Sequence, residues 1–75
     1  MKKLDLHGTR HEFVKSALIR FIEDAWDKEG PKEDAEIITG YSDKMKEIVK
    51  EVLDEYKLEY VEGDAINKGY IKTFI

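Results

Sequence analysis

The residues best suited to chemistry stand near the beginning of the chain, in the segment Leu4-Asp5-Leu6-His7-Gly8. Its two leucines alternate with Asp5 and His7, which is the spacing of a β-strand whose successive side chains point to opposite faces. The leucines are therefore expected to pack on a core, while the acid and the imidazole share the other, open face. Because an imidazole has an ordinary pKa near 6.5, His7 is a candidate general acid or base in catalysis.

Asp5 has alternative roles beside His7. Its carboxylate could orient the imidazole, as a second group does in acid–base pairs. It could equally bind a divalent cation such as magnesium together with His7 and His11, since carboxylates and imidazoles are both metal ligands. A surface carboxylate without a functional role is the third alternative, so the cofactor requirement stays open.

A turn and a helix start follow this strand directly. Gly8 permits a sharp turn, and Thr9 followed three residues later by Glu12 matches a capping box. A helix N-terminus offers N–H groups and partial positive charge to an anion. The acid, the imidazole and the helix start are thus expected close together, as in a phosphate-handling site, with Arg10 as a candidate phosphate clamp.

The rest of the chain predicts alternating helices and strands. Apolar residues at helical spacing predict two helices; Gly30-Pro31 ends the first, and Ser42 or Asp43 caps the second. The apolar stripes of both helices, Trp26 included, are expected in the core. After the first strand, the predicted elements are a helix over 13–26, a strand over 35–39, a helix over 45–56, and strands over 58–62 and 70–75.

This order, β-α-β-α-β-β, predicts an α/β (α+β) two-layer sandwich in a single domain over residues 1–75. Right-handed crossovers put both helices on one face of a four-stranded mixed sheet. The first three strands are expected to be parallel and the last pair antiparallel. Residues 7–11, 39–42 and 63–69 then gather at one sheet edge, where ligands bind in open α/β sheets. Lys44 and Lys68 are expected beside Arg10 at this edge.

Composition narrows the function classes. The net charge of −4 over 75 residues argues against a protein that holds nucleic acid through a global basic field. Residues 1–20 nevertheless carry five basic and two acidic side chains, which favours a local, salt-sensitive basic patch. The chain has no cysteine and no apolar stretch as long as a signal peptide core or a membrane span. We expect a cytoplasmic monomer that does not associate with membranes.

Two motifs indicate a family. The segment Leu4-Asp5-Leu6-His7-Gly8 resembles the N-terminal signature of Smr domains, the small MutS-related domains. A second family motif, [HT]-G-x-G after the second strand, is similar to Thr39-Gly40-Tyr41-Ser42, in which a serine replaces the last glycine. The resemblance spans essentially the whole chain. It implies a fold similar to the C-terminal domain of translation initiation factor three.

The same resemblance implies a function. Asp5 and His7 would be the activity-linked pair of an endonuclease that nicks or cleaves RNA or DNA, and the N–H groups that follow Gly8 and Gly40 would hold the phosphate. The alternative is a non-catalytic module that binds nucleic acid or the ribosome; a third is a domain whose acidic second helix docks a basic protein. Tyr41 and Tyr70 are candidates for stacking on bases. The residues expected to contact nucleic acid are Gly8, Arg10, Thr39, Gly40, Tyr41, Ser42, Lys44 and Lys68.

Overall fold

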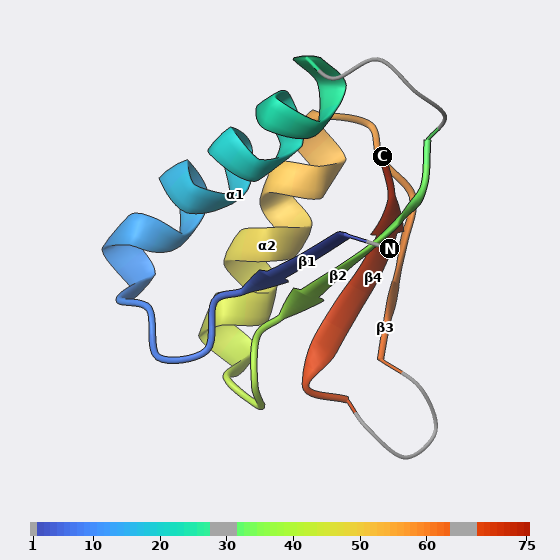
Figure 1. Cartoon of the computed structure of the whole chain (residues 1–75). Helices are drawn as coiled ribbons and strands as arrows, with labels where there is room; N and C mark the ends of the chain where they lie inside the picture. Colours follow the sequence, from blue (N-terminus) through green and yellow to red (C-terminus); the bar gives the residue numbers. More distant parts are fainter. Residues whose placement is uncertain (1, 28–31, 64–67) are drawn as a thin grey trace.

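A four-stranded sheet with two helices packed on one of its faces forms the structure (Figure 1). The computed structural model describes residues 2–27, 32–63 and 68–75. The two-layer arrangement and the element order predicted from the sequence are confirmed. In chain order the elements are β1 (Lys2–Asp5), α1 (His11–Asp27), β2 (Asp34–Ile38), α2 (Asp43–Glu55), β3 (Tyr60–Glu62) and β4 (Tyr70–Phe74).

The order of strands across the sheet is β1-β2-β4-β3. β1 is parallel to β2, whereas β4 is antiparallel to both β2 and β3. β1, β2 and β3 therefore run in one direction, as predicted, with β4 inserted between the last two. The loops after β1 and β2, the start of β4 and the first turns of both helices consequently lie at the same end of the sheet (Figure 1).

The core lies between the helices and the sheet. Three residues of α1 at i, i+4, i+8 spacing are completely buried, and α2 contributes a second apolar row. The buried apolar residues at the centre are Leu6, Val14, Leu18, Ile22, Ile37, Met45, Val49, Val52, Leu53 and Ile71.

The prediction that the whole apolar stripe of α1 is core was wrong at its two ends. Phe13 is 55% exposed and Trp26 is 47% exposed. Both lie in terminal turns of the helix, and the Trp26 ring packs at a tilt against Tyr56 at the end of α2, with the ring centroids 5.5 Å apart. The stripe is therefore longer than the surface that the sheet and α2 cover.

The sequence predicted the start of α2 correctly, but not the start of α1. Ser42 caps α2 as predicted, because its hydroxyl oxygen accepts a hydrogen bond from the Met45 N–H at 3.2 Å. α1, however, begins at His11, and its first turn closes on the Arg10 carbonyl, which accepts from the Phe13 N–H. The capping bond predicted for Thr9 is not among the hydrogen bonds of the described residues. The predicted helix end at Gly30-Pro31 lies outside the described residues.

The end of α2 is a Schellman motif, which also explains why β3 is shorter than predicted. The Leu58 N–H donates to the Leu53 carbonyl at 2.9 Å, and the Lys57 N–H donates to the Asp54 carbonyl at 3.0 Å. Leu58 is thus part of the helix termination and packs on the core, so that pairing with β4 begins only at Tyr60.

Lys57 occupies the left-handed position of this motif, with φ of 57°. We expect Lys57→Gly to raise the free energy of unfolding by about 1 kcal/mol, because glycine has no Cβ to clash in this conformation. Urea denaturation monitored by circular dichroism measures the change. Lys57→Ala is the matched control: it removes the same side chain but keeps the Cβ, and an equal gain in that variant would contradict the explanation.

Neither helix of the described residues has the length and apolar character needed to cross a lipid bilayer.

Candidate functional site

Hydrogen bonds join the three loops that were predicted to meet at one end of the sheet. The Gly69 carbonyl, just before β4, accepts the N–H groups of Thr39 and Gly40, each at 2.9 Å. The Leu6 N–H donates to the Ile38 carbonyl at 2.8 Å, which extends the pairing of β1 with β2. The gathering of the loops after β1 and β2 with Gly69 is therefore confirmed, whereas residues 64–67 of the third predicted loop lie outside the described residues.

Thr39 is a structural part of this junction. Its side chain is buried, and its hydroxyl lies 2.9 Å from the Gly40 carbonyl oxygen and 3.3 Å from the Gly69 carbonyl oxygen. The hydroxyl and the N–H of Thr39 both face protein acceptors, as does the N–H of Gly40. In this structure Thr39 thus shapes the turn, although it was predicted to contact nucleic acid.

His7 lies exposed at the end of β1, with its ring against the second-motif turn. A Cβ built on Gly40 would lie 3.0 Å from the His7 Cδ2 atom, so a larger residue there would push the imidazole out of its present position. In the part of the chain that the structure describes, neither ring nitrogen of His7 has a hydrogen-bond partner. The imidazole therefore contacts the Gly40 turn on one side and is open to a bound ligand.

Asp5 acts on the backbone of His7 and does not contact its ring. Its Oδ1 atom accepts the His7 N–H at 2.9 Å, which fixes the turn after β1. Asp5 therefore does not bind the imidazole, as one prediction had it, but fixes the main chain that carries the ring. No group of three or more metal-ligating side chains occurs among the described residues, so Asp5, His7 and His11 do not form a three-ligand set.

His11 links the starts of the two helices. Its Nε2 atom lies 3.4 Å from the Ser42 hydroxyl, which also accepts the Met45 N–H as the N-cap of α2. From the sequence, His11 was interpreted as an exposed first-turn residue, with metal binding as the alternative, and it is indeed exposed in the first turn of α1. Its position as the first residue of α1 places a second imidazole in the same cluster as His7, beside the turn that Gly40 and Ser42 share.

The two helix N-termini bring partial positive charge to this end of the sheet, and each first turn also holds one carboxylate, Glu12 in α1 and Asp43 in α2. The first N–H groups of a helix have no partner within it, and the helix dipole adds partial positive charge there. A small hollow beside the start of α1 is lined by Thr9, Arg10, His11 and Glu12. The Arg10 Nη1 atom lies 3.7 Å from the Glu12 carboxylate; both side chains are exposed, so the pair is weak and Arg10 can turn to a phosphate.

One of the N–H groups that were predicted to bind phosphate already donates to a protein carbonyl. The Thr9 N–H, which follows Gly8, donates to the Leu6 carbonyl at 2.9 Å and closes the turn after β1. Gly8 itself adopts the left-handed conformation, with φ of 85°.

In the first turns of the helices, the Phe13 N–H donates to the Arg10 carbonyl and the Met45 N–H to the Ser42 hydroxyl. Among the described residues, the N–H groups that remain open to an anion there are those of the first two residues of each helix, at positions 11–12 and 43–44.

A nearly buried lysine that the sequence pattern did not predict, Lys46, lies beside Tyr41. Lys46 is only 8% exposed, and its Nζ atom lies 3.7 Å from Glu62 Oε1, which also lies 3.3 Å from Lys50 Nζ. The Lys50 and Lys46 ammonium groups hold the pKa of the Glu62 carboxyl below its ordinary value. Lys46 Nζ also lies 5.7 Å from the centre of the Tyr41 ring.

The signal that could have identified Lys46 is its position in α2. It follows Met45 directly and precedes Val49 by three residues, so it stands at the border of the buried row and cannot point fully into solvent. Lys44 and Lys68 are exposed. Lys44 lines the flank of α2 toward Tyr60, whereas Lys68 directly precedes Gly69 and so lies at the loop junction.

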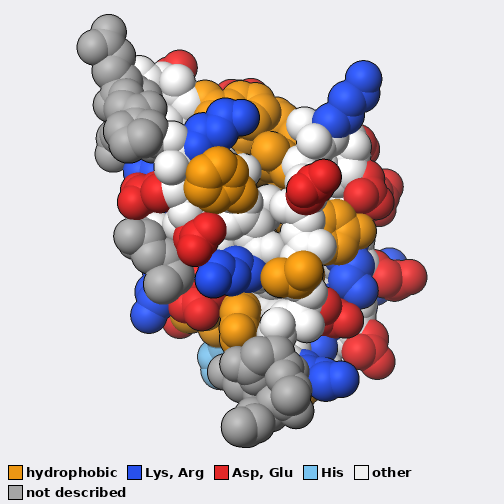
Figure 2. Space-filling view, turned by 90° about the vertical axis from the view of Figure 1, so that its right-hand side faces the viewer, with side chains coloured by type: hydrophobic (Ala, Val, Ile, Leu, Met, Phe, Trp, Pro, Cys, Tyr) orange, Lys and Arg blue, Asp and Glu red, His pale blue; other side chains and the backbone are white. Residues whose placement is uncertain are grey.

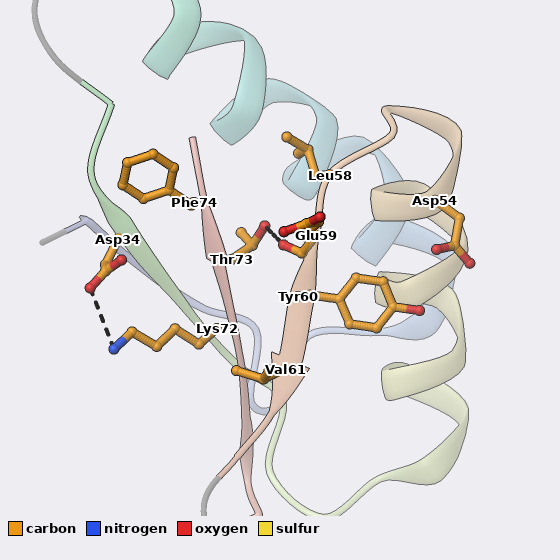
Figure 3. Close-up of a pocket in the computed structure, with 9 residues that line it drawn as sticks. All are labelled: Asp34, Asp54, Leu58, Glu59, Tyr60, Val61, Lys72, Thr73 and Phe74. Atoms are coloured by element: carbon orange, nitrogen blue, oxygen red, sulfur yellow. Dashed lines mark hydrogen bonds and ion pairs between the residues drawn. The ribbon is translucent and has the colours of Figure 1, made fainter.

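The open face of the sheet lacks the charge to bind a polyanion. Figure 2 shows apolar side chains on it interspersed with lysine, aspartate and glutamate. Lys3 pairs with Glu36 at 3.7 Å. The hollow along β3 and β4 is lined by Asp34 and Glu59, by Asp54 of α2 and by one lysine, Lys72, which pairs with Asp34 at 3.4 Å (Figure 3). Phosphate binding is therefore more favourable at the loop end of the sheet than on this face.

Scans against protein-family models, curated proteins and solved structures find no match for this chain.

Gly40 offers a direct test of how the site is packed. Its φ is +66°, and a methyl group there would meet the His7 ring. We expect Gly40→Ala to lower the free energy of unfolding by about 1 to 2 kcal/mol and to displace the imidazole. Urea denaturation measures the first effect, and the NMR shifts of the His7 ring protons measure the second.

Gly8→Ala is the matched control for this substitution. It imposes a similar positive-φ strain, at 85°, but a Cβ at that position has no neighbour within 4 Å. The loss of stability should be comparable in the two variants, whereas the His7 shifts should change more in Gly40→Ala. Equal shifts in both would show that the contact between His7 and Gly40 is unimportant.

Proposed function

We propose that this domain binds a nucleic-acid strand at the loop end of its sheet and cleaves a phosphodiester bond there, as an Smr-like endonuclease acting on RNA or DNA. The observation that carries the proposal is the exposure of the His7 imidazole and its position in the loop cluster. Its imidazole is exposed, unbonded among the described residues and packed on Gly40, in the same loop cluster as two helix N-termini. The two motifs that resemble the Smr signature contain His7 and Gly40, respectively.

In the proposed reaction, different residues bind the phosphate and transfer the proton. The first-turn N–H groups of α1 and α2 and the guanidinium of Arg10 bind the phosphate and stabilise charge on it. His7 removes the proton from the attacking oxygen, which is a 2′-hydroxyl in RNA or a water, or supplies a proton to the leaving oxygen, as the new phosphorus–oxygen bond forms and the old one breaks. Asp5 keeps His7 in position through the backbone N–H. The enzyme would act as a cytoplasmic monomer.

A cleavage assay tests this function. Supercoiled plasmid and a structured RNA are incubated with the wild type and with the double variant Asp5→Asn/His7→Ala, purified identically, in magnesium or in chelator. Cutting by the wild type alone is the expected result, and the two buffers establish the metal requirement. Equal cutting by both proteins would indicate a contaminating nuclease, and no cutting by folded wild type would exclude the proposed activity under these conditions.

A non-catalytic module that binds nucleic acid or a ribosomal RNA surface is the second candidate. One observation favours it: the Asp5 carboxylate accepts a backbone N–H, so the His7 ring has no carboxylate partner to set its tautomer. Binding that survives His7→Ala but is lost in Arg10→Ala, without turnover of either substrate, would select this candidate.

A further inference from the structure

We infer that Tyr41 is a stacking platform for an unpaired base, so that the site takes single-stranded or looped-out nucleotides in preference to regular duplex. The inference rests on the proposed function, because it needs the phosphate of the same nucleotide strand at the helix starts. It adds the structural class of the substrate, which neither the histidines nor the helix N-termini specify.

The position of Tyr41 in the loop cluster is the first support. It directly follows Gly40, against which the His7 ring packs, and directly precedes Ser42, whose hydroxyl lies 3.4 Å from His11. Tyr41 is 73% exposed, more than any other exposed large apolar side chain of the described residues. The most accessible aromatic ring of the described residues thus lies between Gly40, which contacts His7, and Ser42, which contacts His11.

The cation beneath the ring is the second support. Lys46 is nearly buried, and Glu62 holds its ammonium group at 3.7 Å while the ring centre lies 5.7 Å away. A cation at this distance attracts the face of an aromatic ring. Lys50 also pairs with Glu62, at 3.3 Å, so the carboxylate is shared between two lysines and does not neutralise Lys46 alone. The ring is therefore supported from the protein side while most of its surface stays open to solvent.

An open ring next to a phosphate site selects for unpaired nucleotides on physical grounds. In a regular duplex each base is stacked on its neighbours, so its faces are hidden from protein side chains. An unstacked base can lie on an aromatic ring while its phosphate occupies an adjacent anion site, and this contact tolerates any base because every base has a π-face. Tyr41 and the helix starts supply these two contacts side by side.

Fluorescence anisotropy with labelled oligonucleotides tests the inference. The probes are a single strand of about 12 nucleotides, the same sequence as a duplex, and a strand of equal length built from abasic units. The proteins are the wild type, Tyr41→Ala, Tyr41→Phe and, as a matched control, Phe74→Ala, which removes an exposed ring from the open sheet face. Circular dichroism checks that each variant is folded, as expected for substitutions of exposed side chains.

Tyr41→Ala is expected to weaken binding of the single strand about tenfold, and to change duplex and abasic-strand binding less than about twofold. Tyr41→Phe and Phe74→Ala should bind the single strand as the wild type does. If wild type binds these probes but Tyr41→Ala weakens all of them equally or none, the platform is excluded and the proposed function survives. If wild type binds no probe at low salt, both the proposed function and the platform fail.

Discussion

His7→Ala is expected to slow phosphodiester cleavage by roughly 10²-fold to 10⁴-fold, which is the usual contribution of a general acid or base. The imidazole is exposed and has no hydrogen-bond partner in the described structure. Single-turnover cleavage of the plasmid or RNA that the wild type cuts measures the effect. Stability should change little, because the ring lies at the surface.

Two further measurements separate proton transfer from a structural effect of this substitution. Added imidazole should restore part of the activity of His7→Ala, since a small base can enter the space that the side chain leaves beside Gly40. Substrate binding by the variant should stay close to that of the wild type. Full activity of His7→Ala without added imidazole would mean that another group transfers the proton. His11, the other imidazole of the cluster, would be the first candidate.

Ile37→Ala is expected to lower the free energy of unfolding by about 2 to 5 kcal/mol. Ile37 is completely buried in β2, which lies between β1 and β4, and it pairs with Leu4 on one side and Ile71 on the other. A domain of this size has a total stability on the order of 3 to 5 kcal/mol, so a large part of the population should unfold. Urea titration followed by far-ultraviolet circular dichroism measures the loss.

Ile38→Ala is the matched control for Ile37→Ala. The residue is adjacent in the same strand and has the same side chain, but it is only partly buried and faces away from the helices. Its loss should cost about 1 kcal/mol or less. Equal destabilisation by the two substitutions would mean that the core is not confined to the helix side of the sheet.

The strand and helix periodicities in the sequence were enough to determine the layers of this fold. Apolar spacing distinguished strands from helices, and the alternation of the two implied parallel pairing with both helices on one face. The loops after β1 and β2 met as predicted because parallel strands must place their carboxyl ends together. The amino-acid sequence alone therefore assigned His7 and Gly40 to one end of the sheet.

Local rules failed where two elements share a boundary. Thr9 matched a capping box, yet α1 begins at His11, since the Arg10 carbonyl closes the first turn. Leu58 had the pattern of a strand residue but completes the Schellman motif at the end of α2. Trp26 continued the apolar row of α1 beyond the surface that covers it. At the first two boundaries backbone hydrogen bonds decided where the helix begins or ends, and at the third the extent of the neighbouring surface decided what is buried.

The contacts inside the site were decided by the tertiary structure alone. The sequence proposed that Asp5 and His7 act as a pair, but hydrogen bonding directs the Asp5 carboxylate to a backbone N–H. No periodicity brings His11 to Ser42 or Lys46 to Glu62, because each pair joins elements that are distant in the chain. Sequence spacing determines which face of an element a residue occupies. Only the packing of one element on another determines which atoms come within bonding distance.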